Sequence, residues 1–380
     1  MYCAKLKNYE QKHYFLKPMI DQNQLEKTFD PVIEVWRFIA ACAVMAWHYR
    51  SILTNEPSYW ELSATGVDLF FVLSGYVFAP TLINGIRFYP AFLLRRFFRM
   101  YPLYVLAILL YASLPNKDFS SQAIITHLLM LQTSIDVTLI YLYNPAFWSL
   151  PPEWAFYCLM PLLIIFLRWQ GLFIFLLFAF TLRVALGFFV EPPGSHTVNL
   201  TWANWAVVNL PGILSEFLIG VMIFRIRDCV TLRNFQMPIL VTFLSILCFC
   251  IWLYGKFILG QSPKPELGNL VGLIAALIYG VALWLSFPIR SFMRDRSTKF
   301  AMYVGALSYG LYLFHNASPQ WLGQITITFS PWATIIFSIL ATLSLTLCAH
   351  YWIEKPLRSY GRRISEKIMA YQKRSRSDVG

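Results

Sequence analysis

An arginine and a histidine, Arg37 and His48, are separated by ten apolar residues, Phe38 to Trp47. At about 100° per residue, eleven steps along an α-helix make roughly three full turns plus 20°, so the two side chains share one face about 16 Å apart. A cation that can bind an anion and a ring that can move a proton therefore lie on one stripe of one helix. The alternative is that the two residues only mark the interfaces of an apolar helix.

His48 is the best candidate for a general base. Imidazole has an ordinary pKa close to neutral pH and can take a proton from an attacking hydroxyl. A carboxylate usually fixes the tautomer of such a ring, and Asp68 and Glu153 are the available candidates, with no pattern that chooses between them. Whether His48 activates an acceptor directly or is itself briefly acylated is also left open.

A second histidine, His315, ends the run LSYGLYLFH. In this run Ser308, Tyr312 and His315 follow the i, i+4, i+7 spacing of one helix face. A polar stripe within an apolar helix is expected to face the interior of a bundle. His315 is therefore a further candidate catalytic residue, and the alternative is an interfacial histidine that caps its helix.

Arginines alternate with aromatic residues in the segment RFYPAFLLRRFFRMYP. Arg95, Arg96 and Arg99 are close enough on a helix to form one basic patch. Guanidinium groups bind phosphate through paired hydrogen bonds, so these three residues and Arg37 are candidates for binding the phosphates of a cofactor. Anchoring of the membrane topology would place arginines at the same positions and is the alternative.

The elements that position these residues are predicted to be membrane-spanning helices. The 380-residue chain is 58% hydrophobic and only 13% charged, against roughly 25% charged residues in soluble domains. We expect an all-α integral membrane bundle of about ten helices. It would occupy residues 31–357, between a cytoplasmic lead-in at 1–30 and a basic cytoplasmic tail at 358–380 that ends in disorder. The expected spans are Val32–Leu53, Gly66–Ile83, Leu103–Leu114, Ala155–Leu167, Leu172–Val190, Val207–Phe224, Pro238–Tyr254, Gly268–Phe287, Phe300–Asn316 and Pro331–Trp352.

Three stretches are not expected to be spanning helix. Ala123–Leu142 is apolar but carries His127, Gln132 and Asp136, which favours an interfacial or re-entrant segment. The prolines of NPAFWSLPPEW predict a loop that is not regular helix. Glu354-Lys355-Pro356 is expected to stop the last span, with an interfacial ion pair.

The basic residues give the expected orientation. With the N-terminus inside, 26 of the 31 Lys and Arg residues fall on the inner side and four on the outer side, which predicts that both termini are cytoplasmic. The net charge of +12 does not indicate nucleic-acid binding, because the basic residues sit at the ends of apolar runs and do not form one face. The seven cysteines include no CxxC pair, so no metal site is predicted.

The sequence resembles the membrane-bound acyltransferase-3 family, which includes bacterial O-acetyltransferases of lipopolysaccharide and other envelope glycans. The resemblance runs from about residue 30 to 360 and is carried by six motifs in the same order: RFIAACAVMAWH, GVDLFFVLSGY, RRFFRMYPLY, WSLPPEW, LSYGLYLFH and YWIEKPLR. In that family the Arg and His of the first span are the functional pair, and they correspond to Arg37 and His48.

This resemblance implies transfer of an acyl group, usually acetyl, from cytoplasmic acyl-CoA to a saccharide hydroxyl. The acceptor would be a saccharide or glycolipid of the envelope, such as an O-antigen or exopolysaccharide, and the enzyme would lie among the lipids of the bacterial inner membrane. No metal is expected. The competing hypothesis is a transporter or flippase for an envelope precursor, in which the intramembrane charges would line a path.

Overall fold

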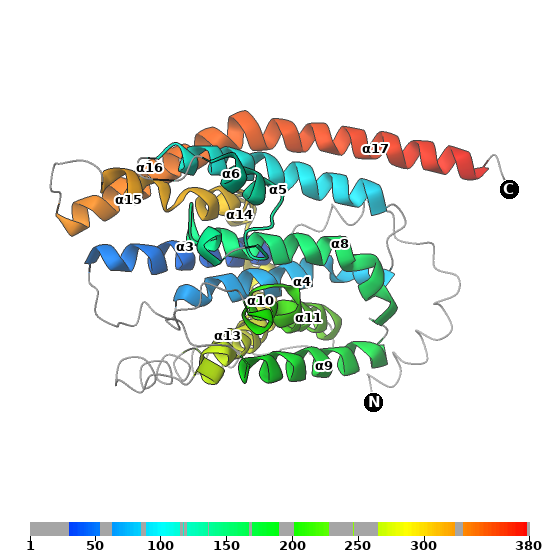
Figure 1. The fold of residues 1–380 in the computed structure, drawn as a ribbon. Coiled ribbons are helices and arrows are strands. Elements are labelled where there is room, and N and C mark those ends of the chain that lie inside the picture. Colours follow the sequence, from blue (N-terminus) through cyan, green and yellow to red (C-terminus); the bar gives the residue numbers. More distant parts are fainter. Residues whose placement is uncertain are drawn as a thin grey trace.

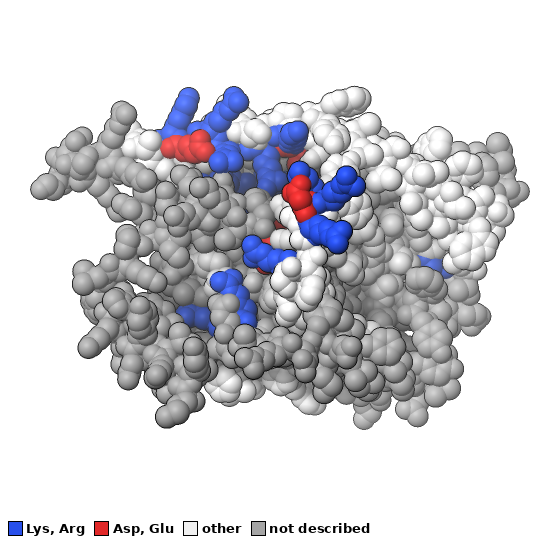
Figure 2. Space-filling view, turned by 180° about the vertical axis from the view of Figure 1, so that it is seen from behind, with Lys and Arg blue, Asp and Glu red and all other residues white. Residues whose placement is uncertain are grey.

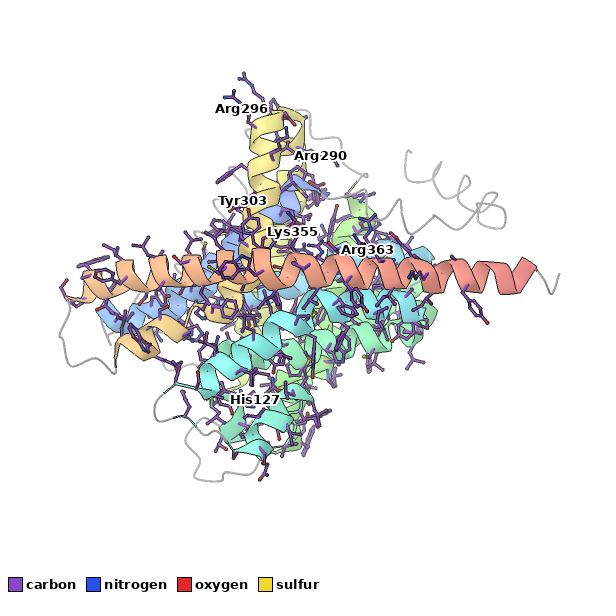
Figure 3. All side chains as sticks on the ribbon, turned by 90° about the horizontal axis from the view of Figure 1, so that it is seen from above. His127, Arg290, Arg296, Tyr303, Lys355 and Arg363 are labelled. Carbon is purple, nitrogen blue, oxygen red and sulfur yellow. The ribbon has the colours of Figure 1, made fainter. Side chains whose placement is uncertain are left out.

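The computed structural model describes residues 30–53, 63–84, 89–114, 120–135, 137–166, 169–189, 201–227, 265–323 and 330–377, with the single residues 117 and 246. Every regular element in these ranges is a helix, which confirms the all-α prediction. Most long helices run side by side along one direction, whereas α14 (Asp295–Phe314) crosses them (Figures 1 and 3). The expected span Pro238–Tyr254, apart from residue 246, and the lead-in up to residue 29 lie outside the described residues.

Ten long helices and seven short ones are described. The other long helices are α3 (Pro31–Leu53), α4 (Gly66–Asn84), α5 (Tyr89–Ala112), α8 (Leu150–Phe166), α9 (Trp169–Gly187), α11 (Leu210–Ile226), α13 (Pro265–Ser286), α16 (Pro331–Ala349) and α17 (Lys355–Ser377). The short ones are α6 (Ser121–Leu128), α7 (Val137–Ile140), η2 (Pro145–Ser149), α10 (Trp202–Val208), η3 (Phe287–Phe292), α15 (Ala317–Leu322) and η4 (His350–Glu354).

Five stretches of the described chain are long and apolar enough to cross a membrane. They are Pro31–Leu53, Ser63–Leu82, Trp202–Ile226, Val271–Phe292 and Pro331–Tyr371. A shorter apolar helix covers Gly171–Gly187. The protein is therefore a helical membrane protein, while the total of ten spans and the side of each terminus stay predictions.

The central packing contact joins α4 to α11 through two glycines. A Cβ atom on Gly75 would lie 1.8 Å from the carbonyl oxygen of Phe217, and one on Gly220 would lie 2.0 Å from that of Val72. Small residues let helix backbones approach closely in membranes, where dispersion rather than the hydrophobic effect holds helices together. Phe156 of α8 stacks on the Phe217 ring with centroids 4.1 Å apart, so a third helix joins this core.

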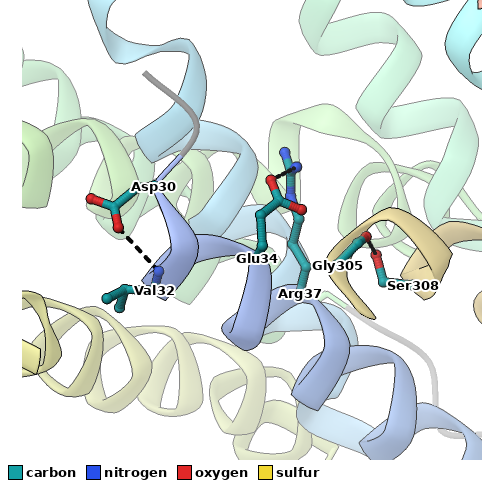
Figure 4. Close-up of polar contacts among 6 residues, drawn as sticks. All are labelled: Asp30, Val32, Glu34, Arg37, Gly305 and Ser308. Carbon is teal, nitrogen blue, oxygen red and sulfur yellow. Dashed lines mark hydrogen bonds and ion pairs between the residues drawn. The ribbon is translucent and has the colours of Figure 1, made fainter. Parts of the chain in front are cut away.

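Helix α3 carries the predicted functional pair, and its N-terminus is fixed locally. Asp30 caps it: the Val32 N–H donates to Asp30 Oδ1 at 3.0 Å, and Pro31 occupies the first turn, where its missing N–H costs nothing (Figure 4). Helix α14 packs closely against this end of α3. A Cβ on Gly305 would lie 2.3 Å from Glu34 Oε2, so glycine is needed at the contact.

The prediction that NPAFWSLPPEW is a loop is wrong for its second half. Pro145–Ser149 forms a short 3-10 helix, and α8 begins immediately after it at Leu150. Pro151 and Pro152 then fall in the first helical turn, where no intrahelical N–H bond is lost. Ala123–Leu142 is, as expected, not one spanning helix: α6 ends at Leu128, and Met130 has a φ of 56°.

The predicted helix stop after the last span is also wrong. Helix α16 passes through the π-helical turn η4 directly into α17, which continues to Ser377, so the expected disordered tail is helical over most of its length (Figure 3). A π-turn widens the backbone and so can accommodate Pro356, which would otherwise clash with the preceding turn. Glu354 pairs with His350 across the turn, Oε2 to Nδ1 at 2.8 Å, in place of the ion pair expected with Lys355.

Candidate active site

Two histidines from distant parts of the chain meet at one end of α3. The rings of His48 and His315, called here the histidine pair, have centroids 4.9 Å apart. His315 is fully buried just beyond the end of α14. The Tyr49 hydroxyl of α3 donates to the His315 carbonyl oxygen at 2.7 Å and lies 3.2 Å from Thr342 Oγ1 of α16. Three helices therefore hold the pair.

Asp68, one of the two carboxylates considered as a partner of His48, lies in a different network. Its electrostatic neighbours are Arg183 of α9 and Glu216 of α11. Arg183 Nη2 lies 3.6 Å from Glu216 Oε1. A Cβ on Gly272 of α13 would lie 2.4 Å from Asp68 Oδ1. This ion network joins α4, α9 and α11 and packs against α13. Glu216 and the role of Arg183 are not predictable from the sequence, because only tertiary packing brings these residues together.

Glu153, the other carboxylate, lies with the arginines. The Ser74 hydroxyl donates to Glu153 Oε1 at 3.1 Å, and the Tyr157 hydroxyl donates to the same oxygen. Glu153 is also within electrostatic range of Arg37. Among the described residues, the ring partner of His48 is thus His315 and not a carboxylate.

Arg37 starts a second centre, about three turns along α3 from His48. Its Nη1 donates to Glu34 Oε1 at 2.8 Å, and its side chain is 12% exposed (Figure 4). Arg99 of α5 lies within electrostatic range of Arg37. The Arg96 guanidinium lies 4.8 Å from the Phe78 ring centroid, and within the described part of the chain its buried Nε meets no acceptor.

A fourth arginine, Arg358, joins this centre from α17. It lies within electrostatic range of both Arg99 and Arg37. Gly361 makes the approach possible, because a Cβ there would lie 2.5 Å from the Phe98 side chain of α5. Arg358 is not among the site residues predicted from the sequence, because Pro356 predicts a helix stop before it. The motif YWIEKPLR, which ends on this residue, was the available signal.

Arg95, by contrast, points to a different contact. Its Nη1 lies 3.9 Å from the Met369 sulfur of α17. The centre is therefore made of Arg37, Arg96, Arg99 and Arg358, which we call the arginine site.

The arginine site carries more positive than negative charge. Arg37 and Arg358 lie within electrostatic range of three carboxylates, against the four guanidinium groups of the site. On the face drawn in Figure 2, Lys and Arg side chains gather over the upper and central part, with a few Asp and Glu side chains among them. Partly buried guanidinium groups in excess favour an anion, and phosphate is the group that their planar fork fits best. The nearby carboxylates are Glu34, Glu153 and Glu354.

Comparison with known protein families matches residues 30–351 to the family described as "Acyltransferase domain". The chain belongs to the acyltransferase-3 family. This acyltransferase is 30% identical over 158 residues to "Protein 2 in picA locus" of Rhizobium radiobacter, an alignment that covers 35% of this chain and 78% of that protein. No solved structure matches the acyltransferase. The matched range contains the histidine pair and three arginines of the arginine site, whereas Arg358 lies beyond it.

Proposed function

We propose that this acyltransferase moves an acyl group, with acetyl as the first candidate, from cytoplasmic acyl-CoA to a hydroxyl of a saccharide of the bacterial envelope. The observation that carries the proposal is the arrangement on α3: a cluster of arginines around Arg37 and a histidine pair at His48, on one helix face about 16 Å apart. Membership of an acyltransferase family supplies the reaction class.

The donor fits the arginine site by its chemistry. Coenzyme A carries several phosphate groups at one end and its thioester at the other, on an extended flexible arm. Phosphates bound by Arg37, Arg96, Arg99 and Arg358 would leave that arm free to run along α3 toward His48. Such charge-assisted contacts contribute about 1.5 to 3 kcal/mol each, so four of them suffice to retain the donor.

His48 would then carry the proton transfer. A neutral ring nitrogen takes the proton of the acceptor hydroxyl, and the oxygen attacks the thioester carbonyl carbon. The C–S bond breaks, and the leaving thiolate receives the proton from His48. The protein's role in this step is to orient both reactants and to hold the proton between attack and departure.

The setting of the reaction is the inner membrane. Large apolar side chains cover the outward face of α9, where Phe173, Ile174 and Phe178 are more than half exposed, as expected for contact with lipid tails. With the predicted cytoplasmic N-terminus, the arginine site would face the cytoplasmic donor. The histidine pair would lie nearer the outer side of the membrane, where the saccharide acceptor would bind.

Inside-out membrane vesicles test the proposal, because they present the cytoplasmic face to added acetyl-CoA. Vesicles that contain the protein are expected to transfer radiolabelled acetyl groups to the saccharide fraction, and vesicles with equal amounts of the His48→Ala variant are not. Label that appears equally in both would contradict the proposal. So would label that appears only when the donor is enclosed in the vesicle lumen, which corresponds to the outer face of the membrane.

A further inference from the structure

The Nε2 atom of His315 has no role in the proposed reaction, and its protonation follows from the hydrogen bond of the other ring nitrogen. The Nδ1 atom of His315 lies 2.8 Å from the carbonyl oxygen of Tyr312. A backbone carbonyl can only accept hydrogen bonds, so Nδ1 carries the proton of the neutral ring. The Nε2 atom of His315 therefore holds a lone pair and can only accept.

This lone pair is buried, and the polar ring next to it is that of His48. His315 is 0% exposed, and its Nε2 atom has no hydrogen-bond partner among the described residues. A buried acceptor left without a donor costs free energy, and native proteins rarely leave one. The His48 ring lies 4.9 Å away, centroid to centroid, at an interplanar angle of 42°. The two rings do not form an N–H···N bond in this geometry. Imidazoles joined by such a bond, with donor and acceptor about 2.9 Å apart, have centroids roughly 5 Å apart, so the separation of the rings allows one to form.

We propose that His315 is a positioning residue that accepts a hydrogen bond from a ring N–H of His48 and so fixes the tautomer of the catalytic base. The inference rests on the proposed function. In hydrolytic triads a carboxylate does this work. Here Asp68 lies with Arg183, and Glu153 lies with Ser74 and Tyr157, so a neutral imidazole takes the place of the acid.

The surroundings hold His315 firmly enough for this role. The Tyr312 hydroxyl donates to the Ala146 carbonyl oxygen at 2.5 Å and lies 2.6 Å from Ser149 Oγ, which fixes the helical turn that bonds the ring. Tyr49 bonds the His315 carbonyl from the other side. An acceptor can orient a base only if its own position is fixed, and both sides of His315 are tied to neighbouring elements.

The proposed arrangement balances the proton through the reaction. One ring nitrogen of His48 takes the proton of the acceptor hydroxyl while the other keeps its N–H bond to His315 Nε2. The new C–O bond forms, the C–S bond breaks, and the thiolate takes the proton from His48. His315 keeps its Nδ1 proton throughout and neither gains nor loses one.

The hydrogen bond can be observed directly, independently of activity. The chain has six histidines, few enough to resolve in ¹⁵N-histidine-labelled protein in lipid bilayers. We expect a nitrogen–nitrogen correlation across the N–H···N bond in the native protein, lost in His48→Gln and in His315→Gln. His127→Gln is the matched control and should retain it. His127 is also 0% exposed with Nδ1 2.9 Å from a backbone carbonyl, but its ring lies against Tyr143. A native protein without the correlation would overturn the inference.

In kinetic measurements the two histidines are expected to differ in how much activity remains after replacement by glutamine. In the acetyl-CoA assay with inside-out vesicles, His315→Leu should lower kcat about 100-fold with the KM for acetyl-CoA unchanged, because the base loses its orientation. His315→Gln should stay within about tenfold of the wild type, since its amide oxygen can still accept, whereas His48→Gln should be inactive. His127→Gln should match the wild type.

Two kinetic results would overturn the role of His315. A fully active His315→Leu variant would show that the base needs no acceptor, and a His315→Gln variant as inactive as His48→Gln would show that the His315 ring handles the proton itself. Failure of the proposed function looks different: the wild-type vesicles would transfer no label, while the nitrogen–nitrogen correlation would still decide the hydrogen bond.

Discussion

At the scale of single residues, His48 is expected to be indispensable for chemistry and dispensable for folding. Loss of a positioned general base typically lowers a rate 10²- to 10⁴-fold, and glutamine cannot take the proton. His48→Gln should therefore abolish acyl transfer in cells at normal membrane levels, as measured by mass spectrometry of the envelope saccharides. If this variant kept more than about a tenth of wild-type acylation, His48 would not be the base.

The arginine site gives a second prediction at this scale. Arg358→Gln removes one charge-assisted contact and should weaken acyl-CoA binding by roughly tenfold or more, with kcat little changed. Arg363→Gln is the matched control, because Arg363 is an exposed arginine of the same helix (Figure 3). Binding of acyl-CoA to purified protein is the measurement. Equal affinity in the two variants would limit the site to the arginines of α3 and α5.

The residues predictable from the sequence are those whose relation is local. Arg37 and His48 are predictable because the eleven residue steps between them on one helix fix their relative positions. The partner of His48 was not predictable, because His315 comes from 267 positions later and only the crossing of α14 brings it close. Glu153 is a candidate partner of His48 by sequence, but the structure places it with the arginines. This difference, too, depends on how the helices pack and not on local spacing.

At the scale of elements, the close contact of α4 with α11 should set the stability of the bundle. Gly75→Ala adds a methyl group where a backbone oxygen lies 1.8 Å away, and overpacking of this kind costs about 1 to 3 kcal/mol. The midpoint of thermal unfolding in detergent should fall. Gly323→Ala is the control, because its nearest atom is at an ordinary 3.4 Å, and an equal loss in both variants would contradict the close packing.

Helix α17 begins where the sequence predicts a helix end. A proline after an acid and a lysine predicts a helix end, yet the π-turn His350–Glu354 carries the chain past Pro356 and brings Arg358 to the arginine site. If α17 serves that site, Gly361→Val should push it away from Phe98 and weaken acyl-CoA binding as Arg358→Gln does. Unchanged binding in Gly361→Val would assign α17 a purely structural role.

At the scale of the whole molecule, the charge bias predicts which side each loop faces. In a variant without its seven native cysteines, Ser51→Cys at the end of α3 should react with an impermeant thiol reagent added outside the cell. Ser291→Cys in η3 should react only after permeabilisation. Both residues are exposed, so accessibility differs by side alone. The reverse labelling pattern would mean that the protein has the opposite membrane orientation, with the arginine site on the side away from cytoplasmic acyl-CoA.

The most direct test of the account separates donor binding from acyl transfer in one assay. Label moved from acetyl-CoA to the saccharide fraction of inside-out vesicles is followed against donor concentration for the wild type, His48→Gln and the double variant Arg96→Gln/Arg358→Gln. We predict that His48→Gln transfers nothing at any donor concentration, while the double variant transfers at a near-normal maximal rate and only at much higher donor concentration. If His48→Gln transferred label, or if the double variant kept the wild-type dependence on acetyl-CoA, the assignment of an anion site and a proton-transfer site to the two ends of α3 would be wrong.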